Sequence, residues 1–173
     1  MGKALDVDTR LLAVNDDYNR GISSRYVKKL QAHLPKGANV AVLGLAYKPL
    51  SHVIDESPGI YLCKALSEAG YRVVGHDNLA ASNAEVALKL NALVTNSLEE
   101  ALKDADTVLV ATTDKSYTSL TADAILRGRK SITVVDFWRC LKHLAADPRI
   151  RYVPIGLCGD ETAAAAGLKP LWF

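Results

Sequence analysis

Residues 37–77 decide the fold, and they read GANVAVLGLAYKPLSHVIDESPGIYLCKALSEAGYRVVGHD. The wholly apolar run at 40–43 is typical of a strand buried in a parallel sheet. After a loop, Ser57-Pro58 opens a helix, with a serine suited to cap it and a proline suited to its first position. Gly70 ends that helix, and a second apolar strand is expected over 71–77. The unit therefore predicts an α/β fold with parallel strands.

The same alternation continues toward the C-terminus. Further strands are expected at 92–94, 107–111, 132–136 and 152–155, with helices at 82–90, 98–102 and about 119–128. Strands that alternate with single helices predict a doubly wound, mostly parallel, Rossmann-like sheet of about six strands.

A helical segment precedes this α/β region. Residues 9–34 predict one or two helices, which Pro35 ends because proline cannot continue the hydrogen-bond ladder. The apolar face is made by Ile22, Tyr26, Leu30 and Leu34, and the polar face by Arg25, Lys28 and Lys29. We therefore divide the chain into a helical segment, 1–36, and an α/β domain, 37–173.

Composition and charge exclude several classes of protein. The net charge is +2, with 21 basic and 19 acidic residues intermixed, so no face suited to nucleic acid is expected. The basic stretches 25–29 and 127–130 are interpreted as solvated helix surface or turn. No apolar run approaches the ~20 residues that a membrane span requires. The three cysteines are widely spaced and indicate reduced thiols in a cytoplasmic protein without a metal site.

In a doubly wound sheet, ligands bind beyond the carboxyl ends of the strands. There, Gly44 permits a sharp turn, Lys48 supplies a cation, and a helix beginning at Ser57 directs N–H groups toward the same space. These features fit a phosphate-binding loop, but also a plain loop with a surface lysine and a capped helix. Gly44 is not followed by the further glycines of a dinucleotide fingerprint. Asp77 could accept from a ribose hydroxyl or form a turn.

A family resemblance becomes specific at this loop. Residues 44–58, GLAYKPLSHVIDESP, resemble the signature G-x-A-[FY]-K-P-x-T-D-D-x-R-E-S-P of the UDP-glucose/GDP-mannose dehydrogenase family, which opens its C-terminal UDP-binding domain. Residues 14–16 resemble the V-N-D segment that leads into this domain, and 104–112 resemble its A-D-x-x-x-x-A-T strand. Residues 114–117 resemble a form found in the N-acetylhexosamine branch. Residues 134–139 resemble V-x-D-x-R, with the arginine displaced by one position.

The resemblance implies a ligand and residues that bind it. It implies UDP or a UDP-sugar as the ligand, contacted by Tyr47 and Lys48. It also implies that Arg139 reaches the substrate, although Arg139 could equally be a helix-start arginine paired with Asp136. The sheet need not cover the apolar face of the helix at 20–34 fully, and the tail 171–173 adds exposed aromatics. In the family this region lies near the dimer core, so a homodimer is expected.

The sequence also departs from the family. His52 and Val53 stand where the signature has two aspartates, and Asp55 replaces the arginine that reaches NAD. The family's NAD domain and catalytic residues precede the V-N-D segment, but only 14 residues precede Asn15. We therefore expect no catalytic residue, no cofactor bound by the chain alone and no dehydrogenase activity, with NAD serving the full-length enzyme. Cys158 is interpreted as an ordinary tail cysteine.

Three functions are compatible with these observations. The first is a module that binds UDP or a UDP-sugar. The second is one half of a split dehydrogenase that works with a separate NAD-binding chain or domain. The third is a degenerate homologue that serves only as a scaffold or dimerisation element.

Overall fold

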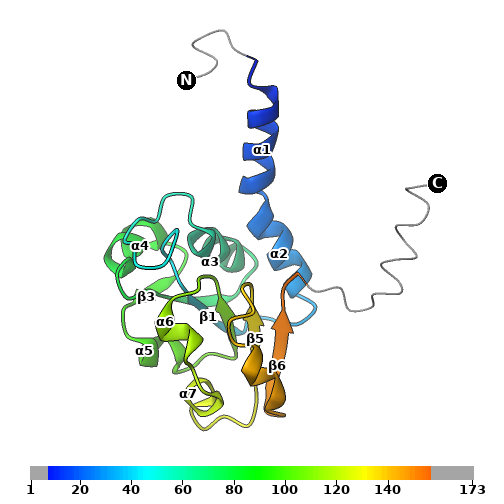
Figure 1. Cartoon of the computed structure of the whole chain (residues 1–173), viewed down its shortest axis with the longest axis vertical. Helices are drawn as coiled ribbons and strands as arrows, with labels where there is room; N and C mark the ends of the chain where they lie inside the picture. Colours follow the sequence, from blue (N-terminus) through cyan, green and yellow to red (C-terminus); the bar gives the residue numbers. More distant parts are fainter. Residues whose placement is uncertain (1–7, 157–173) are drawn as a thin grey trace, which may run out of the picture.

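The computed structural model describes residues 8–156 of the chain (Figure 1). The strands are β1 (Asn39–Leu43), β2 (Arg72–His76), β3 (Leu93–Thr95), β4 (Thr107–Val110), β5 (Ile132–Asp136) and β6 (Ile150–Pro154). The helices are α1 (Arg10–Arg20), α2 (Ile22–Leu30), α3 (Pro58–Glu68), α4 (Ala81–Leu88), α5 (Leu98–Leu102), α6 (Lys115–Thr118), α7 (Ala122–Leu126) and the 3-10 helix η2 (Lys142–Ala146). Every predicted strand is present, and the helix expected at about 119–128 is present as the shorter α7, with α6 as an additional short helix before it.

The strands form one sheet in the order β3-β2-β1-β4-β5-β6, and each described pairing is parallel. The predicted doubly wound, Rossmann-like α/β fold is therefore confirmed. After β3 the chain crosses to β4, on the other side of β1. The switch point consequently lies between β1 and β4, so the loops that leave these strands flank the crevice where such folds bind ligands.

Two apolar clusters cover the two faces of the sheet. On one face, α2, α3 and α4 contribute side chains that include Leu30, Leu66 and Leu88. On the other, α5, α6, α7 and η2 contribute a second set that includes Leu102 and Tyr117. Successive residues of β1 alternate between the two clusters, as the geometry of a strand requires.

The C-terminal end of α3 has the predicted glycine termination. Gly70 has a φ of +86°, a left-handed conformation that favours glycine. Its N–H donates to the carbonyl of Ser67 at 2.9 Å, and the N–H of Tyr71 donates to that of Leu66 at 3.1 Å. These two bonds form a Schellman motif, which turns the chain directly into β2.

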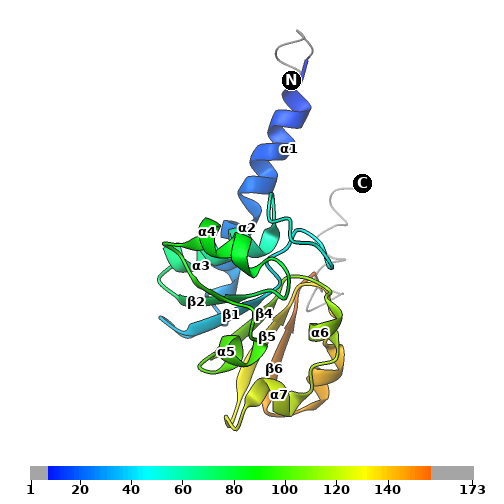
Figure 2. The same ribbon diagram turned by 90° about the vertical axis from the view of Figure 1, so that its left-hand side faces the viewer.

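The two N-terminal helices differ in their surroundings. In α2, Val27 and Leu30 are buried against the sheet and α3, while Lys28 and Lys29 point to solvent. The apolar face predicted here is covered only in part, because Leu30 and Leu34 are buried while Ile22 and Tyr26 stay half-buried. By contrast, α1 has no buried residue and extends away from the rest of the described chain (Figure 2). Among the described residues, no helix is long and apolar enough to cross a membrane.

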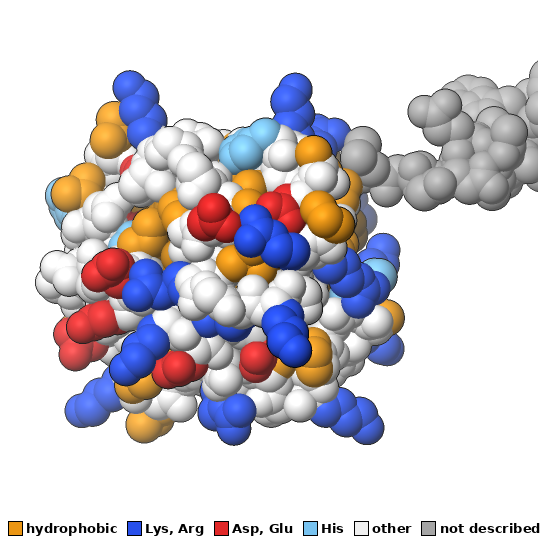
Figure 3. Space-filling model, turned by 90° about the horizontal axis from the view of Figure 1, so that it is seen from below, with side chains coloured by type: hydrophobic (Ala, Val, Ile, Leu, Met, Phe, Trp, Pro, Cys, Tyr) orange, Lys and Arg blue, Asp and Glu red, His pale blue; other side chains and the backbone are white. Residues whose placement is uncertain are grey.

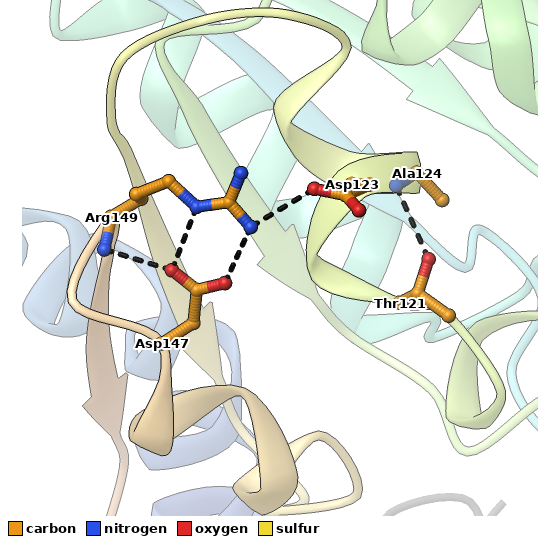
Figure 4. Close-up of polar contacts among 5 residues, drawn as sticks. All are labelled: Thr121, Asp123, Ala124, Asp147 and Arg149. Atoms are coloured by element: carbon orange, nitrogen blue, oxygen red, sulfur yellow. Dashed lines mark hydrogen bonds and ion pairs between the residues drawn. The ribbon is translucent and has the colours of Figure 1, made fainter.

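The edge of the sheet at which β6 begins carries charges of both signs. Figure 3 shows Lys and Arg side chains interspersed with Asp and Glu on this side of the molecule. Arg149, just before β6, pairs with Asp147 at 2.7 Å and with Asp123 of α7 at 2.9 Å (Figure 4). The Arg149 guanidinium lowers the pKa of Asp147 to about 2. Thr121 caps α7 beside this pair by accepting from the N–H of Ala124.

Arg129 lies between the C-terminal ends of α5 and α7. Its guanidinium donates to the carbonyl oxygens of Lys103 at 2.7 Å, and of Leu102 and Ile125 at 2.9 Å each. Such carbonyls lack partners inside their own helices, and an arginine satisfies them well. The interpretation of 127–130 as solvated helix surface or turn therefore holds for the exposed Arg127 and Lys130, whereas the half-buried Arg129 joins two helix ends.

Candidate functional site

The loop that leaves β1 begins at Gly44, where the backbone requires glycine. The φ of Gly44 is +101°, and a side chain here would run into Thr112, two residues beyond β4. A Cβ on Gly59, in the first turn of α3, would run into the carbonyl oxygen of Gly44. The sharp turn predicted at Gly44 is therefore present, and α3 begins in direct contact with it.

Tyr47 and Lys48 occupy the exposed part of this loop. Leu45 and Ala46 are still buried, and the chain reaches solvent at Tyr47, whose side chain is 58% exposed. The N–H of Tyr47 donates to the carbonyl of Val53 at 2.8 Å, which closes the loop on itself. The two residues singled out from the sequence thus stand on an anchored loop at the switch point.

Tyr47 also lines a cleft of about 480 Å³ between this loop and the N-terminal helices. The other lining residues are Asp16, Asn19, Arg20, Ile22, Ser23, Glu56, Pro58 and Tyr61. The hydroxyl of Tyr61 donates to Oε2 of Glu56 at 2.9 Å, and this bond raises the pKa of Tyr61. Sequence reasoning missed the contribution of Arg20 and its neighbours, because it depends on how α1 and α2 meet the loop.

Ser57 precedes α3 but does not cap it. Its side chain is 1% exposed, and its Oγ makes no hydrogen bond with any described residue. The predicted cap is wrong because the hydroxyl is packed inside the fold, whereas a capping side chain must lie over the first turn. A phosphate at this helix would meet main-chain N–H groups rather than the Ser57 hydroxyl. Pro58 is the first residue of α3, as predicted.

Asp77, at the end of β2, is a turn-forming residue and not an open ribose acceptor. One carboxylate oxygen accepts from the N–H groups of Leu79 at 2.9 Å and Ala80 at 2.8 Å. The other accepts from Leu45 and Ala46, both at 2.9 Å. Both carboxylate oxygens already accept hydrogen bonds from the main chain, and the residue is 7% exposed. Of the two roles predicted for Asp77, the structure therefore supports the turn.

Arg139 lies in the loop after β5, exposed and in a left-handed conformation with φ of +58°. Asp136 shapes this loop by accepting from the N–H groups of Trp138 at 3.0 Å and Leu141 at 2.7 Å, and from the Tyr152 hydroxyl at 2.9 Å. In the part of the chain that the structure describes, no ion pair joins Arg139 to Asp136. The alternative that Arg139 pairs with Asp136 is therefore not supported.

An apolar pocket of about 220 Å³ adjoins the cleft and shares three lining residues with it. It is lined by Ile22, Ser23, Tyr26, Pro58, Leu62, Ala111, Phe137 and Trp138. Trp138 is 57% exposed and donates its indole N–H to the carbonyl of Ala111 at 2.8 Å. Phe137 packs edge-on against Tyr26, with ring centroids 5.3 Å apart. The adjacent aromatics after β5 were the sequence signal that could have revealed this pocket.

The predicted site residues lie in two loops at one edge of the sheet. Gly44, Tyr47, Lys48 and Ser57 belong to the connection between β1 and α3, while Arg139 follows β5. Because β4 separates β1 from β5, strand spacing places the two loops about 10 Å apart. The edge therefore combines two exposed cations, an exposed tyrosine and an apolar pocket.

This arrangement agrees with a comparison against protein families. The family model described as "UDP-glucose/GDP-mannose dehydrogenase family, UDP binding domain" matches residues 41–143. The chain belongs to the UDP-glucose/GDP-mannose dehydrogenase family. Its matched part is the family's UDP-binding domain, which runs from β1 through the loop after β5 into η2.

Relatives of this UDP-binding domain are UDP-glucose 6-dehydrogenases. The chain is 33% identical to AglM of Haloferax volcanii over 139 residues, which cover 76% of the chain and 32% of that protein. It is 29% identical to the Rhizobium meliloti enzyme over 146 residues, covering 84% of the chain and 33% of the relative. The chain thus spans about a third of the length of these relatives.

Solved structures support the fold. A UDP-glucose dehydrogenase from Pyrobaculum islandicum superposes with a TM-score of 0.63 at 24% identity, covering 88% of this chain and 33% of that one. A GDP-mannose dehydrogenase from Pseudomonas aeruginosa gives a TM-score of 0.59 at 18% identity, covering 87% and 35%. At these identities the similarity shows a shared fold.

The positions that depart from the family signature lie on the exposed side of the β1–α3 loop. His52, Val53 and Asp55 are exposed, and the carbonyl of His52 accepts from Asn83 of α4 at 2.9 Å. Glu56 adopts a left-handed conformation with φ of +56°. This part of the loop is thus held by a contact to α4, although its charges differ from those of the family signature.

The segment 114–117, which suggested an N-acetylhexosamine, is largely structural in this domain. Asp114 caps α6 by accepting from the N–H of Ser116 at 2.9 Å. Tyr117 is buried, and its hydroxyl lies 2.9 Å from Nδ1 of His76. Burial lowers the pKa of His76. Since Tyr117 is only 1% exposed, it cannot touch a ligand at the edge of the sheet.

The described thiols are inert. Burial raises the pKa of Cys63 to about 12, and burial with the neighbouring Asp136 raises that of Cys140 to about 11. Neither forms appreciable thiolate near neutral pH. Among residues 8–156, no three His, Cys, Asp or Glu side chains are grouped so as to hold a metal ion. Cys158 and the tail 171–173 lie outside the described residues.

Proposed function

We propose that this domain binds UDP, or the UDP part of a UDP-sugar, at the carboxyl edge of the sheet, with Lys48 against the diphosphate. The observation that carries the proposal is the anchored loop at the switch point. The N–H groups of Leu45, Ala46 and Tyr47 already have protein partners. These three N–H groups are therefore not free to bind a diphosphate, and Lys48, an exposed cation of that loop, would neutralise its charge together with the N–H groups at the start of α3.

Tyr47 and Arg139 would complete the contacts. Tyr47 is exposed on a loop that its own N–H holds by a hydrogen bond to Val53, so its ring can stack against the ligand. Arg139 projects from the neighbouring loop, whose conformation Asp136 fixes, and its planar fork suits a diphosphate or a carboxylate. The main-chain turn at Gly44 and the beginning of α3 at Ser57 would lie beneath the phosphates.

Binding of UDP should raise the stability of the chain. A ligand at a hundred times its dissociation constant stabilises a fold by about 2.7 kcal/mol. For a chain of this size, that corresponds to an increase in Tm of roughly 5–10 °C. Thermal unfolding with and without UDP measures it, with uridine as the control that lacks the phosphates. An unchanged Tm at millimolar UDP would favour the scaffold function.

The activity of the whole protein is a further part of the proposal. The relatives are UDP-glucose 6-dehydrogenases, so the chain would serve oxidation of a UDP-sugar to a UDP-uronate, with NAD held by a separate domain or chain. The chain alone would bind no cofactor. Asp55 supports this division, because it stands where the family signature has the arginine that reaches NAD. The separated thiols fit a cytoplasmic location.

We also propose that the chain forms a homodimer through α1. Leu11, Val14 and Tyr18 are exposed and lie three and four residues apart, on one stripe of the helix. Light scattering should give the mass of two chains, and the variant Leu11→Glu/Val14→Glu should give that of one. Val86→Glu, at another exposed apolar position on α4, is the matched control and should remain dimeric. A wild-type mass of one chain at micromolar concentration would exclude this dimer.

A further inference from the structure

Asp77 makes contacts that a turn alone does not require. Two of its four hydrogen bonds are local, to Leu79 and Ala80. The other two cross from β2 to the loop after β1, where Oδ2 accepts from the N–H groups of Leu45 and Ala46 at 2.9 Å each. These partners lie 32 and 31 residues away in the sequence.

The position of Asp77 follows from the register of the sheet. Leu43 pairs with His76, so Asp77 stands level with Gly44, where the chain leaves β1. The residue is 7% exposed, and a buried carboxylate is stable when several N–H groups point at it. The Asp77 carboxylate therefore fastens the last buried residues of the loop, directly before its exposed part begins at Tyr47.

We propose that Asp77 is a positioning residue for nucleotide binding, which sets the place of Tyr47 and Lys48 without touching the ligand. This inference rests on the proposed function. In dinucleotide-binding folds of this kind, an acidic residue in the chain after the first helix accepts from the ribose. Here the Asp77 carboxylate, at the end of β2, instead accepts hydrogen bonds from the loop after β1. It thereby positions the part of that loop that carries Lys48, the lysine that neutralises phosphate.

Asp77→Asn tests the role with little change in volume. The side-chain oxygen of asparagine can still accept the two hydrogen bonds of the local turn, a role in which asparagine is common. Its NH₂ group then faces the N–H groups of Leu45 and Ala46, and two donors cannot form a hydrogen bond. We expect the UDP dissociation constant to rise about tenfold and the amides of Leu45, Ala46 and Tyr47 to lose protection from hydrogen exchange. Asp106→Asn is the matched control, because Asp106 accepts one main-chain N–H, from Asn39 at 2.9 Å, at the opposite edge. It should leave both quantities unchanged.

A double variant separates positioning from a general loss of structure. If Asp77 acts through Lys48, then Asp77→Asn/Lys48→Ala should bind UDP about as weakly as the weaker single variant. Additive losses would overturn the inference. The inference would also be overturned if Asp77→Asn bound UDP with wild-type affinity while Lys48→Ala bound it weakly. In that case the proposed function would stand. No UDP binding by the wild-type chain would overturn both.

The wild-type chain provides a measurement that does not depend on the variant folding. In an NMR titration with UDP, the amides of Leu45 and Ala46 should be protected before ligand is added and should stay protected, because Asp77 holds them in both states. Strong UDP-induced shifts of these two amide protons, larger than those of Tyr47 and Lys48, would show that they bind phosphate and would overturn the inference.

Discussion

Gly59→Ala should lower the free energy of unfolding by about 3 kcal/mol or more, the upper range for inserting a methyl group into a packed core. The new Cβ would meet the carbonyl oxygen of Gly44, and Gly44 C and Leu45 Cα lie 3.1 and 3.2 Å from it. These are main-chain atoms of the β1 end and its loop, so no side chain can rotate away. The helix α3 would have to move, which disturbs the packing of Ile60 and Leu66. Urea denaturation followed by circular dichroism measures the change.

Gly21→Ala is the matched control for this prediction. Gly21 also lies at a helix start with a negative φ, but the nearest atom to its added Cβ is the end of the Arg25 side chain. That side chain can move, and alanine favours helix, so the free energy of unfolding should change by less than about 1 kcal/mol. A loss in Gly59→Ala no larger than in Gly21→Ala would show that α3 and the β1 loop do not meet as described.

Lys48→Ala should weaken UDP binding by about 10- to 100-fold, equivalent to about 1.4–2.7 kcal/mol. The lysine is exposed on a loop that other residues hold in place, so its loss removes a phosphate contact without removing a structural one. The free energy of unfolding without ligand should change by less than about 0.5 kcal/mol. Calorimetric titration measures the affinity, and denaturation measures the stability.

Lys36→Ala provides the control for charge alone. Lys36 is an exposed lysine just before β1, at the opposite edge of the sheet from Lys48. Both variants lower the net charge by one, so any long-range effect on an anionic ligand is shared between them. Equal losses of UDP affinity in the two variants would show that the nucleotide does not bind at the β1–α3 loop.

Features set by neighbouring residues could be predicted from the sequence. The apolar runs predicted the strands, and Gly70 predicted the end of α3, because these depend on local conformation and hydrogen bonds within a few residues. Gly44 predicted a sharp turn for the same reason. The signature over 44–58 indicated the family, which the match over residues 41–143 shows.

Only the tertiary structure decided what several polar side chains do. The position of Ser57 before α3 predicts a helix cap, but the folded chain buries its hydroxyl away from the first turn of that helix. The segment 114–117 resembles a form found in the N-acetylhexosamine branch, but its Tyr117 is buried against His76 of β2, 41 residues away in the sequence. From the sequence, Asp77 could bind a ribose or form a turn. Its hydrogen bonds to Leu45 and Ala46 exist only because β1 and β2 pair in one register. The sequence by itself determined the fold and the family through local patterns, whereas the partner of each polar group depends on which distant segments the folded chain brings within about 3 Å.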